Sequence, residues 1–209
     1  MRGLDLARAY FEECGAPMLH EQFPAWEGVI AAGLCGSGSE CLGYDDEVSQ
    51  DHDFEAGFCL FLPGEDVIDR QTAFRLERAY AKLPKEFRGF QKSFLSPVGG
   101  SRHGVIRISD FFLSKLGKAD GSLHGYDWFC VPEYDLLEAT NGEIFRDDLG
   151  LLTEKRLALA YLPEDVRLKK LAGELAAMAQ AGQYNYPRCL ERGERVAAML
   201  ALAKFAEEA

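Results

Sequence analysis

Apolar and polar positions in the first 110 residues switch between helical and strand periods. Apolar side chains recur at helical spacing over residues 4–13 and again over residues 66–83. The second half of residues 26–35 and all of residues 56–62 are short apolar runs, and these predict buried strands. Residues 103–109 alternate loosely and contain three β-branched residues, which predicts a further strand. This order of helices and strands indicates an α/β-type domain.

The pattern changes in the last third of the chain, where residues 151–209 are almost entirely helical in character. Pro163 and Pro187 suit the first positions of two helices. Two apolar stripes follow them, which we interpret as core packing: Leu168, Leu171, Leu175 and Met178, then Leu190, Ala197, Leu200 and Phe205. We therefore expect an α+β fold with two domains, residues 1–118 and a mainly helical C-terminal domain, residues 119–209.

The final apolar-striped helix pattern continues to Ala209 without a glycine or proline stop. One hypothesis is that this helix offers a surface to a second copy of the chain or to another protein partner. The alternative is that the sequence stops before the natural end of the chain.

The composition of the chain disfavours several classes of binding partner and structural site. The chain has 209 residues and a formal net charge of −11, so it is not expected to bind extended nucleic acid, although an RNA end remains open. Six cysteines without a Cys-x-x-Cys pair favour reduced, buried thiols over disulfides or a zinc site. Neither a signal-peptide pattern nor an apolar run of membrane-spanning length occurs, which predicts a cytoplasmic protein that does not enter a membrane.

The candidate chemistry lies between the first two predicted strands. Asp51 and Asp53 are two residues apart, and on an extended chain their carboxylates project to the same side, where they can share Mg²⁺ or Mn²⁺. A small-residue turn comes shortly before them and can offer backbone N–H groups to a phosphate: Gly36, Ser37, Gly38 and Ser39. We call residues 36–39 the glycine turn. Together, turn and carboxylates predict a site for a metal-bound nucleoside triphosphate.

These residues also match parts of other known motifs. An acidic stretch such as residues 45–55 is commonly a solvated loop. The Walker A motif fails because Glu40, not lysine, follows the second serine, and the Rossmann pattern fails because Cys41 replaces its third glycine. An EF-hand beginning at Asp51 would require glycine and glutamate where the chain has Ala56 and Leu62.

Two stretches of the chain resemble the DNA polymerase β-like nucleotidyltransferase superfamily. They are residues 36–47, which begin with the glycine turn, and the run Asp51-His52-Asp53-Phe54. Within this superfamily, the chain is most similar to an uncharacterised bacterial branch, a domain of unknown function that resembles the kanamycin and minimal nucleotidyltransferases. Later stretches, residues 111–117, 143–153 and 159–166, extend the resemblance over most of the chain.

The resemblance implies a mixed sheet flanked by helices, with residues 1–118 as the nucleotidyltransferase domain and a C-terminal helical bundle. It implies that the glycine turn binds the triphosphate and that Asp51 and Asp53 bind Mg²⁺. Active members of the superfamily use a third acid on a later strand. The candidate strand here has no interior acid, and Asp110 at its end is the residue expected to take this role, with Glu133 as another possibility.

The sequence therefore predicts an enzyme that moves a nucleoside monophosphate from an NTP, with ATP as the expected donor, to a hydroxyl of a small molecule, protein or RNA end. Arg102, Arg107 and Lys115 are candidates for phosphate contacts, although surface charges are commoner. The alternative is a catalytically weak nucleotide-binding or toxin-antitoxin-type regulatory module, because an interior third acid is missing.

Overall fold

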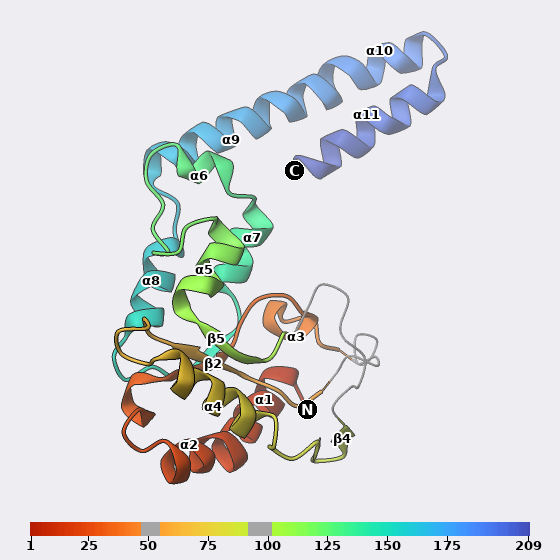
Figure 1. Ribbon diagram of the computed structural model, residues 1–209. Coiled ribbons are helices and arrows are strands. Elements are labelled where there is room, and N and C mark those ends of the chain that lie inside the picture. The colour runs from red at the N-terminus through yellow and green to blue at the C-terminus, as the bar shows by residue number, and fades with distance from the viewer. Residues whose placement is uncertain (47–54, 92–101) are drawn as a thin grey trace. The chain divides into compact units, whose positions relative to one another are not determined.

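The computed structural model describes residues 1–46, 55–91 and 102–209 (Figure 1). Its tertiary contacts divide the chain into two compact units, Met1–Tyr161 and Leu162–Ala209. The expected α+β fold, with a mixed sheet and a helical C-terminal part, is confirmed. Tertiary contacts divide the chain later than the expected domain boundary at residue 118, because a strand beyond that residue belongs to the sheet of the first unit.

The first unit contains one four-stranded sheet and a small hairpin in its described residues. The sheet strands are β1 (Ala31–Leu34), β2 (Cys59–Leu62), β5 (Gly104–Arg107) and β6 (Glu143–Arg146), and the hairpin pairs β3 (Glu86–Phe87) with β4 (Phe90–Gln91). The larger helices are α1 (Gly3–Tyr10), α2 (Ala16–Gln22), α4 (Arg70–Tyr80), α5 (Ile108–Leu116), α7 (Glu133–Thr140) and α8 (Leu151–Leu159). Shorter segments are η1 (Phe11–Gly15), η2 (Glu27–Val29), α3 (Ser39–Leu42) and α6 (Asp127–Cys130).

The strand order is β5-β2-β1-β6. β1 runs antiparallel to both β2 and β6, whereas β2 and β5 are parallel. Sequence reasoning finds β1, β2 and β5 close to their observed bounds but gives no indication of β6. β6 has only four residues, all half-buried, with charged side chains at both of its ends.

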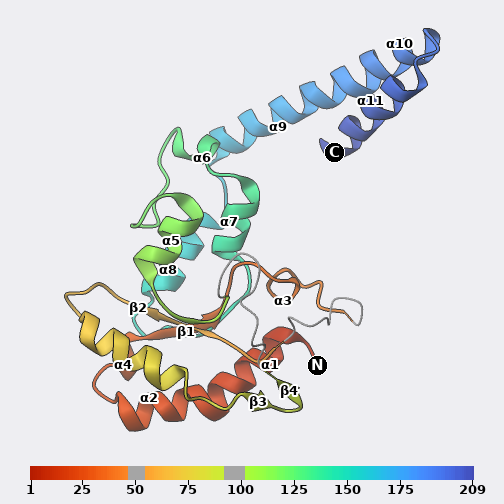
Figure 2. The same ribbon diagram turned by 45° about the vertical axis from the view of Figure 1, so that its right-hand side comes forward.

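Helices cover both faces of the sheet, as Figures 1 and 2 show, with α1, α2 and α4 on one side and α5, α7 and α8 on the other. β2 accounts for this arrangement because its alternate residues point to opposite faces. Leu60 and Leu62 join the large apolar core with α1, α2 and α4. Phe61 faces the other way and meets Phe111 of α5 edge-to-face, with ring centroids 5.3 Å apart.

Phe58, immediately before β2, is the centre of an aromatic cluster. Its ring lies 5.0–5.6 Å from the rings of Tyr10, Phe11 and Tyr80. The Tyr80 hydroxyl donates to the Phe58 carbonyl at 2.7 Å and accepts from its N–H at 3.2 Å. One hydroxyl from α4 therefore satisfies both backbone groups where the chain enters the sheet, which fixes the start of β2.

The second unit is helical, with α9 (Glu164–Met178), η3 (Ala179–Asn185), α10 (Tyr186–Glu191) and α11 (Arg195–Glu207). Phe205 packs so closely on Gly182 that a Cβ there would lie 2.6 Å from its ring. Leu168, Leu171 and Leu175 were expected in a core, but each is about half exposed. Among the described residues, no helix has both the length and the apolar character needed to cross a membrane.

Replacing Tyr80 with phenylalanine is expected to lower the free energy of unfolding by about 1–3 kcal/mol, because the buried N–H of Phe58 loses its acceptor. Urea unfolding followed by tryptophan fluorescence measures this, since Trp26 and Trp128 both lie in the first unit. Tyr44→Phe is the matched control because the Tyr44 side chain is exposed. Equal midpoints for the two variants would contradict the assigned role of the hydroxyl.

Candidate functional site

The carboxyl end of β1 and the amino ends of β2, β5 and β6 lie together at one end of the sheet. Gly33 pairs with Cys59 and Leu34 pairs with Glu143, so the carboxyl end of β1 lies beside the amino ends of β2 and β6. Cys59 also pairs with Gly104, which brings the amino end of β5 to the same place. The glycine turn follows β1 directly and therefore lies at this end.

The backbone of the glycine turn requires glycine at two positions. Gly36 has φ +108° and Gly38 has φ +126°, values that other residues rarely adopt. Gly36 is buried, whereas the Ser37 side chain beside it is exposed. Ser39 is the first residue of α3. The expected turn is therefore present, and its first serine is accessible to a ligand.

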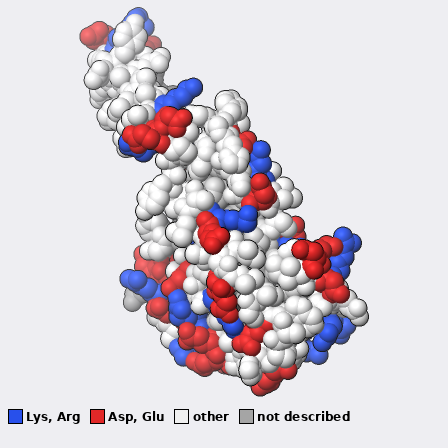
Figure 3. Space-filling model, turned by 90° about the vertical axis from the view of Figure 1, so that its left-hand side faces the viewer, with Lys and Arg blue, Asp and Glu red and all other residues white. Residues whose placement is uncertain are grey.

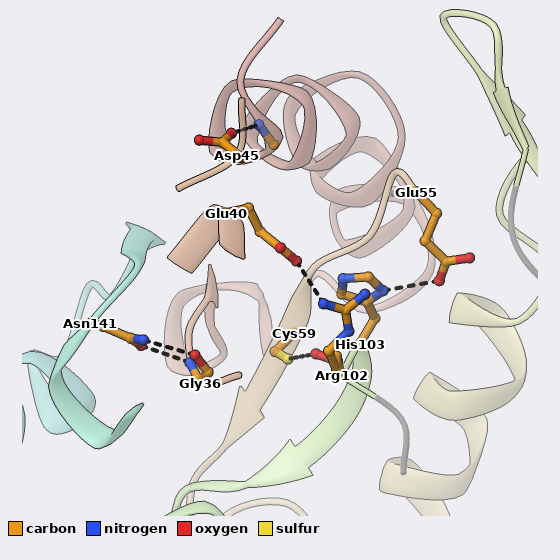
Figure 4. Close-up of polar contacts among 9 residues, drawn as sticks. Gly36, Glu40, Asp45, Glu55, Cys59, Arg102, His103 and Asn141 are labelled. Carbon is orange, nitrogen blue, oxygen red and sulfur yellow. Dashed lines mark hydrogen bonds and ion pairs between the residues drawn. The ribbon is translucent and has the colours of Figure 1, made fainter. Parts of the chain in front are cut away.

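Asn141, at the end of α7, clamps the glycine turn. Its Oδ1 accepts a hydrogen bond from the Gly36 N–H and its Nδ2 donates to the Gly36 carbonyl, both at 2.8 Å (Figure 4). The next residue continues the connection, because the N–H of Gly142 donates to the Cys41 carbonyl at 3.1 Å. The clamp places the turn against the amino end of β6.

A buried arginine supports this clamp from behind. Arg156 of α8 is 8% exposed and donates to the Thr140 carbonyl at 2.7 Å and to the Asn141 carbonyl. Its other terminal nitrogen lies 2.7 Å from the Cys35 Sγ, one residue before the glycine turn. A cation that binds the last carbonyls of a helix is favoured by the helix dipole, so Arg156 ties the end of α7 to the end of β1.

An ion pair and a histidine–carboxylate contact complete this end of the sheet (Figure 4). Arg102 Nη1 lies 3.3 Å from Glu40 Oε1, and His103 Nδ1 lies 3.2 Å from Glu55 Oε1. All four side chains are largely buried, with exposures from 5% to 21%. Arg102 and His103 immediately precede β5, whereas Glu40 belongs to α3. Acidic and basic groups from distant parts of the sequence therefore meet beside the glycine turn.

The predicted metal ligands Asp51 and Asp53 lie outside the described residues, so their geometry is not part of the site described here. Asp110 is described and does not meet the glycine turn. It is an exposed residue in the first turn of α5, after the carboxyl end of β5. Because β5 and β2 are parallel, that end of the sheet is opposite the glycine turn. Among residues 1–46, 55–91 and 102–209, no three His, Cys, Asp or Glu side chains form a metal-binding group.

Asn141 and Arg156 were not anticipated from the sequence, and their contacts explain why. Each acts on residues more than 100 positions away, and neither belongs to a local motif. The dipeptide Asn141-Gly142 is a turn signal, which could have indicated a break between a helix and a strand. It could not have indicated which backbone the amide would bind.

Burial raises the pKa values of the cysteine thiols beside the site. The pKa of Cys35 is raised from about 9 to about 11, chiefly by burial and against the opposing charge of Arg156. Burial also raises the pKa of Cys59 to about 12, with a smaller contribution from Cys35. Both thiols therefore stay protonated at neutral pH and are poor candidates for nucleophiles or metal ligands.

Asn141→Ala is expected to lower the free energy of unfolding by at least about 2 kcal/mol, because the buried N–H and carbonyl of Gly36 both lose their partner. Asn141→Asp retains the acceptor but not the donor, so its loss should be intermediate. Asn185→Ala, at an exposed position in η3, is the control and should change stability by less than about 0.5 kcal/mol. Urea denaturation measures all three, and an Asn141→Ala value equal to the control would rule out the clamp.

The raised thiol pKa values predict weaker folding in alkali. Above about pH 9 the unfolded chain loses thiol protons that the folded chain keeps, so the free energy of unfolding falls by about 1.4 kcal/mol per pH unit for each such group. This loss should be visible between pH 8.5 and 10.5 in reducing buffer. Cys59→Ala should make the slope shallower by about one proton than in the unaltered chain. A slope equal to that of the unaltered chain would contradict the assignment to Cys59.

Comparison with known proteins gives one match. A family model described as a domain of unknown function (DUF4037) matches residues 128–209, which is less than half of the chain. No curated protein and no solved structure matches the chain significantly. The matched segment includes Asn141, β6 and Arg156, and the glycine turn lies outside it.

Proposed function

We propose that the protein is a Mg²⁺-dependent nucleotidyltransferase that moves a nucleoside monophosphate from an NTP to an acceptor hydroxyl. The glycine turn would hold the triphosphate, and Asp51 and Asp53 would hold the metal ion. The resemblance to DNA polymerase β-like nucleotidyltransferases supports this assignment at the motif level. The matched family model has no described function and therefore leaves the activity open.

The observation that carries the proposal is the position of the glycine turn. The turn follows β1 at the sheet end where β2 begins, and Asn141 fixes its backbone there. Asp51 and Asp53 precede Glu55, the first described residue after them, by four and two residues in the sequence. Glu55 itself is bound to His103, which immediately precedes β5. A turn that binds phosphate, next to the strand that follows two carboxylates, would supply the arrangement that the reaction requires.

The residues of the turn would divide the work of binding. The Gly36 N–H already donates to Asn141, so phosphate oxygens would be bound from Ser37 onward, by backbone N–H groups and by the exposed Ser37 hydroxyl. Ser39 adds a second hydroxyl at the start of α3. Bound Mg²⁺ would neutralise the charge of the triphosphate and of the departing pyrophosphate.

The structure gives Asp110 no part in this proposal, because it lies beyond the opposite end of the sheet. Without an acid in that role, the acceptor hydroxyl lacks an assigned general base, whose help is typically worth about 10²–10⁴-fold in rate. This observation favours the second candidate function, a module that binds nucleotide and transfers it slowly or not at all.

The net charge of the protein limits the class of acceptor that it is expected to bind. The net charge of −11 disfavours an extended polyanion, and acidic and basic side chains are interspersed on the face shown in Figure 3. An acceptor that is a cationic or neutral small molecule, a protein hydroxyl or a short RNA end fits this surface better than a long nucleic acid.

The proposal predicts release of pyrophosphate from ATP in the presence of Mg²⁺ or Mn²⁺ and a panel of hydroxyl acceptors. Asp51→Asn and Asp53→Asn should each lower this rate at least about 100-fold, because several kcal/mol of transition-state stabilisation are lost. Asp66→Asn makes the same charge change at an exposed site and should retain the full rate. Equal rates in all three variants would overturn the assigned metal site, and nucleotide binding without turnover would support the second candidate.

A further inference from the structure

The chain segment that builds the proposed nucleotide site contains no strong cation. Residues 9–69 include 14 aspartate and glutamate residues but neither lysine nor arginine. This segment contains β1, the glycine turn, Asp51, Asp53 and β2. A triphosphate bound there would meet a strongly negative region, and any lysine or arginine that assists the metal ion has to come from another part of the chain.

Arg102 reaches the glycine turn from outside that segment. A Cβ built on Gly38 would lie 2.7 Å from Arg102 Nη1 and 2.6 Å from Glu40 Oε2. The guanidinium and the carboxylate therefore lie directly against the Cα of Gly38, in the space that a larger residue would fill. The absence of a side chain at Gly38 is what allows a charged group to approach the backbone of the turn this closely.

The other candidate cations are committed elsewhere. Arg107, at the carboxyl end of β5, donates to the carbonyls of Pro63 and Ile68 at 2.9 and 3.0 Å. Lys115 of α5 pairs with Glu138 of α7. Arg107 lies at the sheet end opposite the glycine turn, and Lys115 follows it in α5. Of the three candidate phosphate contacts in the sequence, Arg102 is therefore the one that lies at the turn.

We propose that Arg102 is the side chain that binds the triphosphate at the glycine turn, and that Glu40 holds its guanidinium there until nucleotide binds. This inference rests on the proposed function and names the cation for the same site. The guanidinium has five donors in a planar fork, so it can bind phosphate oxygens in pairs. Its hydrogen bond to Glu40 is long, at 3.3 Å, so a phosphate oxygen placed closer to the guanidinium would be a stronger acceptor than Glu40.

Glu40 acts as a placeholder for the phosphate charge. Its side chain is 11% exposed and that of Arg102 is 21% exposed, so each would be costly to leave without a counter-charge. The pair keeps the guanidinium beside Gly38 in the nucleotide-free protein. Glu40 also competes with phosphate for Arg102, so its removal should strengthen nucleotide binding rather than weaken it.

Calorimetric titration of the full chain with Mg·ATP tests this. Arg102→Gln should weaken binding by about 10- to 100-fold, the loss expected for charge-assisted hydrogen bonds to phosphate. Arg102→Lys should fall between Arg102→Gln and the unaltered chain, because it keeps the charge without the fork. Arg70→Gln is the matched control: it removes an arginine from an exposed pair with Glu65 and should change the affinity less than about twofold.

Substitutions at Glu40 distinguish a loss of nucleotide binding from a loss of folded structure. Glu40→Gln should bind Mg·ATP as tightly as the unaltered chain or several-fold more tightly. The double variant Glu40→Gln/Arg102→Gln removes both charges of the pair and should bind as weakly as Arg102→Gln alone, with an unchanged circular dichroism spectrum. If Glu40→Gln weakens binding as much as Arg102→Gln, the pair only supports the turn and the proposal is wrong.

The outcomes also distinguish this inference from the function on which it rests. Binding by the unaltered chain that is equally strong in Arg102→Gln and Arg70→Gln would overturn the role of Arg102 and leave the nucleotidyltransferase proposal standing. Failure of the unaltered chain to bind Mg·ATP would overturn both.

Discussion

The two hydrogen bonds between the Asn141 side chain and the Gly36 backbone join positions 105 residues apart. Gly36 is buried and has a left-handed backbone, so its N–H and carbonyl cannot be satisfied by a regular strand or helix. Asn141 satisfies both groups with one planar amide, and Arg156 holds the carbonyl of Asn141 in turn. The shape of the glycine turn thus depends on a helix end that the sequence places in the other half of the chain.

The same end of the sheet holds two largely buried carboxylates and provides a partner for each. Glu40 and Glu55 are largely buried, and each is paired with a residue that immediately precedes β5. Two carboxylates so close to a proposed triphosphate site would otherwise repel the ligand. Arg102 gives Glu40 a positive counter-charge and the His103 ring lies within hydrogen-bond distance of Glu55, so both carboxylates gain their partners where β5 enters the sheet.

The sequence predicts the features that depend on local chemistry. The apolar runs of β1 and β2 and the special backbone of Gly36 and Gly38 follow from residue type alone. Prediction fails where partners are distant. β6 is short and half-buried, so its apolar signal is weak. The resemblance alone assigns Asp110 to the site, and it cannot show the direction of β5 or the start of α5 at Ile108, which are set by tertiary pairing and place Asp110 at the opposite end of the sheet.

The clamp by Asn141 also limits which segments of this protein can be removed or replaced independently. The segment that matches the family model, residues 128–209, contains the clamp, but the turn that it holds lies about ninety residues before that segment begins. A fragment that ends before residue 128 keeps every residue of the turn and loses what gives the turn its shape. The turn and the clamp are therefore structurally coupled, and replacing residues 128–209 by an unrelated sequence would leave the Gly36 backbone without its hydrogen-bond partner.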